Sequence, residues 1–560
     1  MVAAAPPGGE RTLRAVEPAT AASPTAPAKP TPTAAPAGPN FEAQLIERRA
    51  ARLRDLPAPP QPPKVDAPTI NPIDAFIAAR WSQAPAGPAP QLCDKATFMR
   101  RVYLDVVGHI PSVLEANRFL AGRDSHQRRE QLVDSLLARS ADYAAHWTVF
   151  WEDALASQSV LSQGGILTHG DYRQWLLTSF EQNRPYDVMV AELIDPGMPR
   201  RKGPEAKEVL GTTFAIEYVR NEDHTATLQT ASNVGQVFLG TSMKCASCHD
   251  HFENDEWPQD RFLAFAGLFA AHDLERIRCE LKGGHVVPAR FPFDVPGTTA
   301  AVPQDVNERL HLAAQLVTDP ANPRFARAIV NRLWKRYLGL GLFEPADDFR
   351  LDTPASHPEL LDWLAHDFLA HGCDLQHTIR LILTSRTYQL RYDAALEDHW
   401  DVSQPKAPRY FRSPTLRRLT AEQFLDSVRV AAAGELAPNE RAFLDARSTA
   451  LARALGRPAS RNEISTGRPD DVAVVQSLEL LNGGELAELI GSGTALVDGA
   501  ARQDPRRLVD RLYRAALSRP ASVTEKNLGR AYLQASEAPE DGLRDMFWAL
   551  VCGPEFQYVK

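Results

Sequence analysis

The chain has 560 residues, of which 44% are hydrophobic and 24% charged, and its formal net charge is −8. A chain of this length and composition is globular and long enough for two or three domains. The acidic balance offers no basic footprint for nucleic acid, and no apolar run reaches the length that crosses a bilayer. We therefore expect neither nucleic-acid binding nor a transmembrane segment.

Residues 1–66 are rich in proline, alanine and threonine and poor in large apolar side chains. Such a segment has little surface to bury and favours extended conformations, so we expect a disordered tether. Within it, residues 41–56 have helical spacing and predict a short helix. A functional alternative is that this helix docks onto a partner.

Residues 67–278 carry helical periodicity and predict an all-α first lobe. Asp94, Ser112 and Ser125 stand where N-caps are expected, and Glu115 completes a capping box with Ser112.

Two further helices are predicted within residues 169–194, with a break at residues 183–185, and another over residues 227–239 that Gly240 ends. An aromatic cluster precedes them, which we interpret as a seam of the core rather than the wall of a cofactor site: His146, Trp147, Phe150 and Trp151.

The next helix leads directly into Cys245, Cys248 and His249, which form the sequence C-A-S-C-H. This spacing is that of c-type haem attachment, in which two thiols form thioethers with the vinyl groups and the histidine is an axial ligand of the iron. We therefore take these three residues as the candidate cofactor site.

Two alternatives to haem remain open from the residues alone. Zinc or iron would need further ligands, for which His249 itself, His251, His272 and Cys279 are the nearby candidates. A redox-active C-x-x-C would favour a βαβ context, whereas the flanking sequence here is helical.

The second axial position of a haem has no clear sequence candidate near the motif, because His251 and Met243 lie too close to His249 along the chain to reach the opposite face of the ring. More distant candidates are His224, His272 and His285, or no residue at all. We expect apolar walls from a helix that begins after Pro258, at Phe262, Phe265 and Phe269.

Residues 279–310 contain a Gly-Gly turn between short β-like runs and predict an extended or hairpin junction between two helical lobes. Residues 311–560 return to helical periodicity, with an expected capping box at Ser356 and Glu359 and an N-cap at Asp374. The paired Asp347 and Asp348 are interpreted as solvated surface rather than a catalytic pair.

Several long motifs carry a family resemblance. RRVYLDVVGHIPS, DYRQWLLTSFEQNRPYD and the segment around CASCHDH resemble the DUF1549 family, the planctomycete cytochrome-like domain. ARAIVNRLWKRYLGLGLFEPADDF and SHPELLDWLAHDFLA resemble the DUF1553 family, its frequent companion. The chain departs from the first family after His251, where an acidic segment, residues 252–256, replaces the usual Pro-Phe-Asp.

The resemblance implies an exported, periplasmic protein with a c-type haem that transfers electrons or supports a redox enzyme through an unknown partner protein. The first residues lack the charged and apolar regions of a signal peptide. The alternative is a scaffold or binding protein stabilised by zinc or iron, without a redox role. No residue pattern decides whether the protein is an enzyme.

Overall fold

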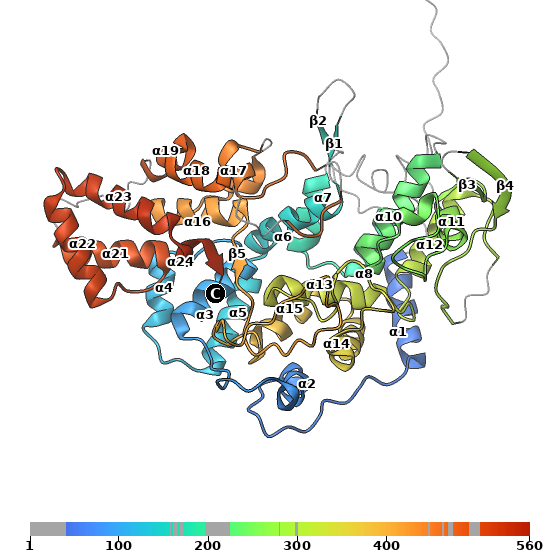
Figure 1. The fold of residues 1–560 in the computed structure, drawn as a ribbon, viewed down its shortest axis with the longest axis horizontal. Helices are drawn as coiled ribbons and strands as arrows, with labels where there is room; N and C mark the ends of the chain where they lie inside the picture. The colour runs from blue at the N-terminus through green and yellow to red at the C-terminus, as the bar shows by residue number, and fades with distance from the viewer. Residues whose placement is uncertain are drawn as a thin grey trace, which may run out of the picture. The chain divides into compact units, whose positions relative to one another are not determined.

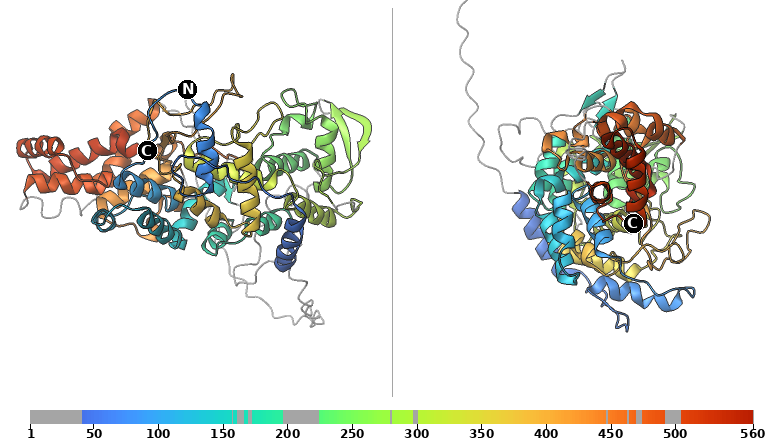
Figure 2. Two further views of the ribbon diagram at one scale, coloured as in Figure 1. Left: turned by 90° about the horizontal axis from the view of Figure 1, so that it is seen from below. Right: turned by 90° about the vertical axis from the view of Figure 1, so that its left-hand side faces the viewer.

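The computed structural model describes residues 41–156, 158–160, 166–168, 172–195, 224–278, 281–296, 301–445, 448–461, 464–468, 474–491 and 504–559. It is 57% helix and 3% strand, which confirms the prediction of an all-α fold. In Figure 1 the colour follows the chain, and the helices after residue 420, in orange and red, lie together, as Figure 2 also shows.

The first helices begin close to the predicted caps. Their bounds are α2 Pro72–Ala79, α3 Lys95–Val106, α4 Val113–Leu120, α5 His126–Leu137, α6 Ser140–Ala154, α7 Tyr172–Glu181 and α8 Tyr186–Ile194. The side chains of Asp94, Ser112 and Ser125 accept hydrogen bonds from the backbone of α3, α4 and α5, and Glu115 closes the predicted capping box. The break between α7 and α8 lies where Pro185 was expected to cause it.

The following helices surround the C-x-x-C-H segment and continue into the second half. Their bounds are α10 His224–Leu239, α11 Gln259–Ala266, α12 Val306–Val317, α13 Phe325–Leu338, α14 Pro358–Ala370 and α15 Leu375–Thr384. Asp374 caps α15 as predicted. The capping box predicted at Ser356 is wrong: the N-cap of α14 is His357, and the Ser356 hydroxyl donates to the carbonyl oxygen of Leu342 instead.

The C-terminal helices form the last group. Their bounds are α16 Ala421–Ala433, α17 Ala450–Ala454, α18 Val474–Asn482, α19 Gly484–Gly491, α21 Pro505–Leu517, α22 Val523–Ala535, α23 Pro539–Cys552 and α24 Pro554–Gln557. Thr420 and Gln423 form a capping box at the start of α16, and Gly434 ends that helix in the left-handed conformation.

Strands in the described residues form three antiparallel pairs: β1 Gln158–Val160 with β2 Ile166–Thr168, β3 Leu274–Arg278 with β4 Leu281–Val287, and β5 Arg417–Arg418 with β6 Tyr558–Val559. The β3–β4 pair contacts α11 and overlaps the predicted junction, but the predicted position of the hairpin is wrong: β3 precedes residue 279, and the Gly-Gly pair expected at the turn lies within β4. The β5–β6 pair connects the segment just before α16 with residues 558–559 near the end of the chain.

The buried apolar side chains form two large clusters, but the division between them is not at the predicted junction. The first runs from Ile73 to Phe411 and includes side chains from both halves of the chain. The second combines Leu104 and Ile110 with side chains from Leu419 to Val559. The junction at 279–310 therefore does not separate two cores, because α12 and α13 pack on α8 and α10.

Residues 41–66 correct the prediction of a disordered tether over residues 1–66; residues 1–40 of that tether lie outside the described residues. Helix α1, Phe41–Asp55, contacts α8 and α14. The Arg49 guanidinium is 2.6 Å from the buried Asp187 carboxylate, and Arg48 is 2.7 Å from Asp319. The helix predicted here thus docks onto its own chain, through ion pairs that composition does not reveal.

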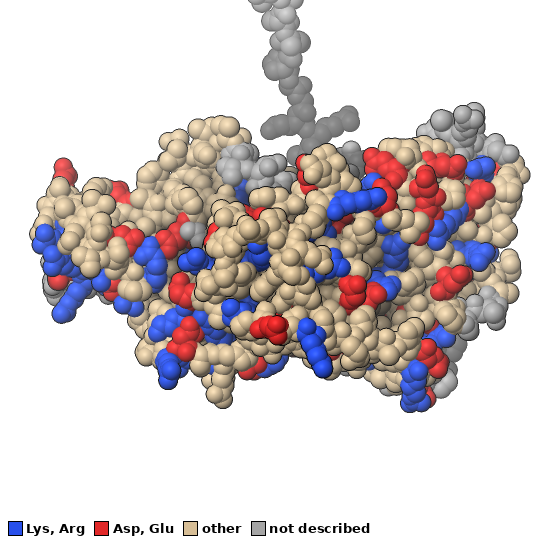
Figure 3. Space-filling model, turned by 60° about the horizontal axis from the view of Figure 1, so that its bottom comes forward, with Lys and Arg blue, Asp and Glu red and all other residues tan. Residues whose placement is uncertain are grey.

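In the part of the chain that the structure describes, no helix is both long enough and apolar enough to cross a membrane. On the face drawn in Figure 3, acidic and basic side chains are interspersed.

We predict that Arg49→Ala releases α1 from the rest of the protein. Burial raises the pKa of Asp187 even though Arg49 opposes that shift, so loss of the guanidinium leaves a poorly solvated carboxyl group beneath the helix. Cleavage of α1 by thermolysin under native conditions should accelerate by roughly tenfold or more, the equivalent of about 1.4 kcal/mol.

Arg54→Ala is the matched control, because Arg54 is exposed on the same helix. Equal cleavage rates in both variants would show that the Arg49–Asp187 pair does not hold α1.

Candidate functional site

The C-x-x-C-H segment lies between α10 and α11. Gly240 ends α10 with a positive φ of 58°, and a short 3-10 turn, Lys244–Ser247, contains the first cysteine. Met243, fully buried, packs so closely on α10 that a Cβ at Gly235 would lie 2.2 Å from its terminal methyl carbon. The sulfur of Met243 is therefore part of the core and unsuited to bind a cofactor at the surface.

The motif side chains face outwards. Cys245 is half-buried, Cys248 and His249 are exposed, and both cysteines are free of disulfide bonds. The Nδ1 atom of His249 is 2.7 Å from the carbonyl oxygen of Asp250. Since a carbonyl oxygen can only accept, Nδ1 carries the proton, and the lone pair of the neutral ring is on Nε2.

Asp250 and Gln259 fix the backbone of the motif against α11. The Asp250 carboxylate accepts the backbone N–H of Gln259 at 2.8 Å, in the first turn of the helix. The Gln259 amide in turn donates to the carbonyl oxygen of Ser247 at 3.3 Å. Gln259 thus holds the loop on both sides of Cys248 and His249, at Ser247 and at Asp250.

His251, unlike His249, points inwards. Its backbone N–H donates to the carbonyl oxygen of Trp257, and its Nδ1 accepts the N–H of Glu253 at 3.2 Å. Burial lowers the pKa of His251, and the nearby Arg350 contributes in the same direction. His251 is therefore a neutral hydrogen-bond acceptor inside the loop.

The acidic segment after His251 attaches this loop to the second half of the chain. Glu253 pairs with Arg350 at 2.9 Å, and Glu256 pairs with Arg324 at 2.9 Å. Arg350 also contacts Asp348 at 2.5 Å. The acidic residues that distinguish this chain from the usual family sequence thus form ion pairs with arginines of the second half of the chain.

The predicted metal ligands do not converge. Within the described residues, the one group of three or more His, Cys, Asp or Glu side chains whose ligand atoms lie within 4.8 Å of one another is elsewhere, at Asp367, His371 and His377. His272 is exposed, and Cys279 lies outside the described residues. The described geometry around the motif therefore gives no support to a zinc or iron site built from Cys245, Cys248, His249, His251 and His272.

The phenylalanines expected to wall a cofactor site are fully buried instead: Phe262, Phe265 and Phe269. The ring of Phe265 packs edge-on against Phe269 and Phe291, within the main core. The apolar groups exposed beside the motif are Phe252, at 70% exposure, and Leu351, at 80%. Each is next in sequence to one member of the Glu253–Arg350 ion pair, so these exposed apolar groups come from the two segments that this pair joins rather than from α11.

The more distant axial candidates are placed differently. His285, on β4, is exposed, with Nε2 3.9 Å from Asp260; Arg276 links Asp260 to Asp250 of the motif. His272 is exposed in the turn before β3. The side chain of His224 lies outside the described residues.

A cavity of about 760 Å³ is the feature that the sequence did not predict. It is lined from α6 and α10 in the first half and from α13 and α16 in the second, and it reaches Ser242, three residues before Cys245. Its acidic lining side chains are Asp105, Asp153, Asp347, Asp348, Glu422 and Asp426.

Asp347 and Asp348 were expected on a solvated surface, which is wrong. Asp348 is 6% exposed, and it accepts the backbone N–H of Ser242 at 3.3 Å. Asp347 pairs with Arg332 at 2.5 Å. The regularly spaced basic residues of α13 were the available signal that these two carboxylates have partners. The signal was easily missed, because Asp347 and Asp348 lie after the end of that helix.

The aromatic cluster lies partly in the core and partly at the wall of the cavity. Trp147 and Trp151 are buried in the core as predicted, while His146 and Phe150 also line the cavity.

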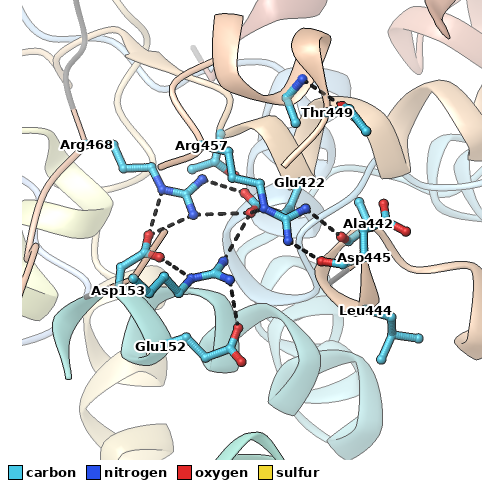
Figure 4. A network of polar contacts seen from close by, with 12 residues as sticks. Glu152, Asp153, Glu422, Ala442, Leu444, Asp445, Thr449, Arg457 and Arg468 are labelled. Carbon is cyan, nitrogen blue, oxygen red and sulfur yellow. Dashed lines mark hydrogen bonds and ion pairs between the residues drawn. The ribbon is translucent and has the colours of Figure 1, made fainter. Parts of the chain in front are cut away.

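Three of the lining side chains, Asp153, Glu422 and Arg468, belong to a network of buried ion pairs (Figure 4). Arg468 bridges Glu422 at 2.5 Å and Asp153 at 2.7 Å, and Arg461 contacts Asp153 at 2.5 Å and Glu152 at 3.4 Å. Burial alone would raise the pKa of Glu422, but the charges of the surrounding arginines outweigh it and lower the pKa to about 2. The network therefore joins α6 to α16 as fully charged groups.

Two family models match the chain, one in its first half and one in its second half. The DUF1549 family model, PSCyt2, described as a protein of unknown function, matches residues 72–273. The DUF1553 model, PSD1, also described as a protein of unknown function, matches residues 308–533. No curated protein and no solved structure matches the chain. The resemblance inferred from the motifs is confirmed.

Glu422→Gln should destabilise the protein by roughly 3 kcal/mol, because it leaves the buried Arg468 and its neighbours short of one negative charge. Thermal unfolding at pH 7 measures the effect. Glu359→Gln, which removes a carboxylate that is more than half exposed, is the control and should change stability little. A Glu422 variant as stable as this control would contradict the role of the network.

The protein should also lose stability as the pH falls below 6.5. Burial, reinforced by Arg441, lowers the pKa of His109 to about 4, and burial with Arg336 lowers that of His146 well below its usual value. The unfolded chain therefore takes up protons at a higher pH than the folded protein does. His109 alone should cost roughly 3 kcal/mol between pH 6.5 and pH 4.

Urea unfolding at a series of pH values measures this loss. His109→Asn should flatten the profile, whereas the same change at the exposed His399 should leave it unaltered. Stability that stays constant or rises between pH 7 and pH 5 would contradict the assignment of neutral buried histidines.

Proposed function

Because residues 72–273 are a DUF1549 domain, whose family name denotes a planctomycete cytochrome-like domain, and residues 308–533 are a DUF1553 domain, we propose that this chain is a c-type cytochrome. In this proposal Cys245 and Cys248 attach the haem, His249 is its proximal ligand, and the protein transfers electrons to or from a partner.

The orientation of the His249 ring is the observation that carries the proposal. Its Nδ1–H donates to the carbonyl oxygen of Asp250, which leaves Nε2 as the ligand atom. The same contact holds the ring in one tautomer and increases its basicity, as the outer hydrogen bond of a metal-bound histidine does. His249 is exposed, so no part of the core blocks Nε2.

The thiols meet the requirements of attachment. Both are free of disulfide bonds, both reach the surface, and they lie on a loop whose backbone Asp250 and Gln259 fix. A bound haem would supply one-electron redox chemistry. The exposed side chains of Phe252 and Leu351 offer apolar surface that would pack against a porphyrin.

The residues around the loop limit which side chain would hold the haem together with His249. Met243 is buried and His251 points inwards, so neither would reach a haem bound on the outside of the loop. His285 is the candidate that the ion pairs through Asp260 and Arg276 connect to the motif. We further propose that the protein acts outside the cytoplasm, where a second redox protein meets the exposed loop.

Production of the full chain together with a haem-attachment system tests the proposal. The protein should show a Soret band that remains after acid-acetone extraction, since a thioether-linked haem is not extractable. Cys245→Ala combined with Cys248→Ala should abolish the retained band, and His249→Ala should keep the covalent haem but change its spectrum because the proximal ligand is lost.

Cys552→Ala is the matched control, because Cys552 is a half-buried free cysteine outside the motif. It should bind haem as the parent protein does. A folded, colourless parent protein, or haem that acid-acetone removes completely, would contradict attachment at Cys245 and Cys248.

A further inference from the structure

The 760 Å³ cavity lies between side chains of the two family segments, and the haem proposal does not use it. Its size is within the range of small-molecule sites. Asp105 and Asp153 line it from the DUF1549 segment, and Arg336, Arg417 and Glu422 from the DUF1553 segment.

Most basic side chains of the cavity have a carboxylate partner. The pairs are Arg332 with Asp347 at 2.5 Å, Lys335 with Glu344 at 2.9 Å, Arg417 with Asp105 at 2.7 Å, Arg441 with Asp426 at 2.7 Å, and Arg468 with Glu422 at 2.5 Å. Arg336 differs from these, because no carboxylate oxygen of the described residues lies within 4.0 Å of its guanidinium.

Arg336 is held in place by neutral groups. Its Nη2 donates to Nε2 of His146 at 2.8 Å, so this ring nitrogen must be unprotonated. The guanidinium carbon lies 4.7 Å from the centre of the Trp147 ring and 5.2 Å from that of Phe150. Stacking and one hydrogen bond fix the plane of the guanidinium but leave its charge without a counterion.

The charged groups around Arg336 are of both signs, and burial is the largest effect on it. Burial, together with the charges of Arg417 and Arg468, lowers the pKa of Arg336, although Tyr337 and Asp105 oppose the shift. The neighbouring His146 experiences the charges of Arg336, Arg441 and Arg417. A cation that burial desolvates, and that no carboxylate contacts, is costly unless an anion neutralises it.

We propose that this cavity binds a small organic anion, whose carboxylate or other oxyanion group pairs with Arg336. The planar fork of arginine suits two oxygens of such a group, and its remaining N–H groups are available for them. Phe150 and Phe443, which also line the cavity, offer apolar surface for the rest of the ligand. The cavity is thus a ligand site separate from the C-x-x-C-H loop.

Thermal unfolding of the full chain with benzoate or inorganic phosphate, at constant ionic strength set with chloride, tests the site. A ligand that binds the folded state raises the unfolding temperature in a concentration-dependent way. We expect saturable stabilisation by at least one of the two anions. A response to benzoate alone indicates a carboxylate with an apolar part, and a response to phosphate indicates a tetrahedral oxyanion.

Arg336→Gln should weaken the affinity by about tenfold or more, in line with loss of a charge-assisted hydrogen bond. Arg290→Gln removes the same charge at an exposed position and should leave the affinity unchanged. Without added anion, Arg336→Gln should unfold at the same or a higher temperature, because it removes a desolvated charge that no carboxylate of the described residues contacts. A purely structural arginine would instead lower that temperature.

Arg336→Lys keeps the charge without the fork, and it should also weaken binding; it serves in place of Arg336→Gln if the latter does not fold. The proposal is overturned if neither anion stabilises the parent protein beyond the effect of chloride. It is equally overturned if the Arg336 variants respond to the anions as the parent protein and Arg290→Gln do.

Discussion

The need to pair buried charges is the constraint on which the rest of this structure depends. Arg461 and Arg468 stand between Asp153 on α6 and Glu422 on α16, at distances of 2.5 to 2.7 Å for their closest contacts. A buried charge without a partner costs several kcal/mol, so neither side of this network is stable alone. The first and second family segments therefore share a polar interior as well as an apolar core, and we consider them one folding unit.

The same constraint extends to the C-x-x-C-H loop. Asp348 accepts the backbone N–H of Ser242 and pairs with Arg350, which in turn pairs with Glu253 behind the motif. The loop is consequently fastened to the DUF1553 segment, although its cysteines belong to the DUF1549 segment. This attachment gives a physical reason for the two domains to occur in one chain, because the second domain supplies the counterions that hold the C-x-x-C-H loop of the first.

Local features of the sequence predicted local structure well. The N-cap at Asp94 and the capping box of Ser112 and Glu115 depend on neighbouring residues, and both are present. The prediction at Ser356 failed because His357 takes the N-cap, a choice set by the contact of Ser356 with Leu342.

Features that depend on distant partners were not predictable. Asp153 and Arg461 are 308 residues apart, and the helix over Phe41–Asp55 is held by partners at Asp187 and Asp319. The cavity, assembled from five helices and several loops, leaves no contiguous pattern in the chain. The sequence therefore predicted the candidate haem-attachment residues, which lie within five positions of the chain, but not the ion-paired cavity.

Peptide mass spectrometry of protein produced with a haem-attachment system tests the central claim most directly. The proteolytic peptide that contains Cys245, Cys248 and His249 should carry the mass of one haem, with fragmentation that assigns a thioether to each cysteine. The same peptide recovered with two free thiols, under conditions in which a known c-type cytochrome is fully modified, would contradict the account.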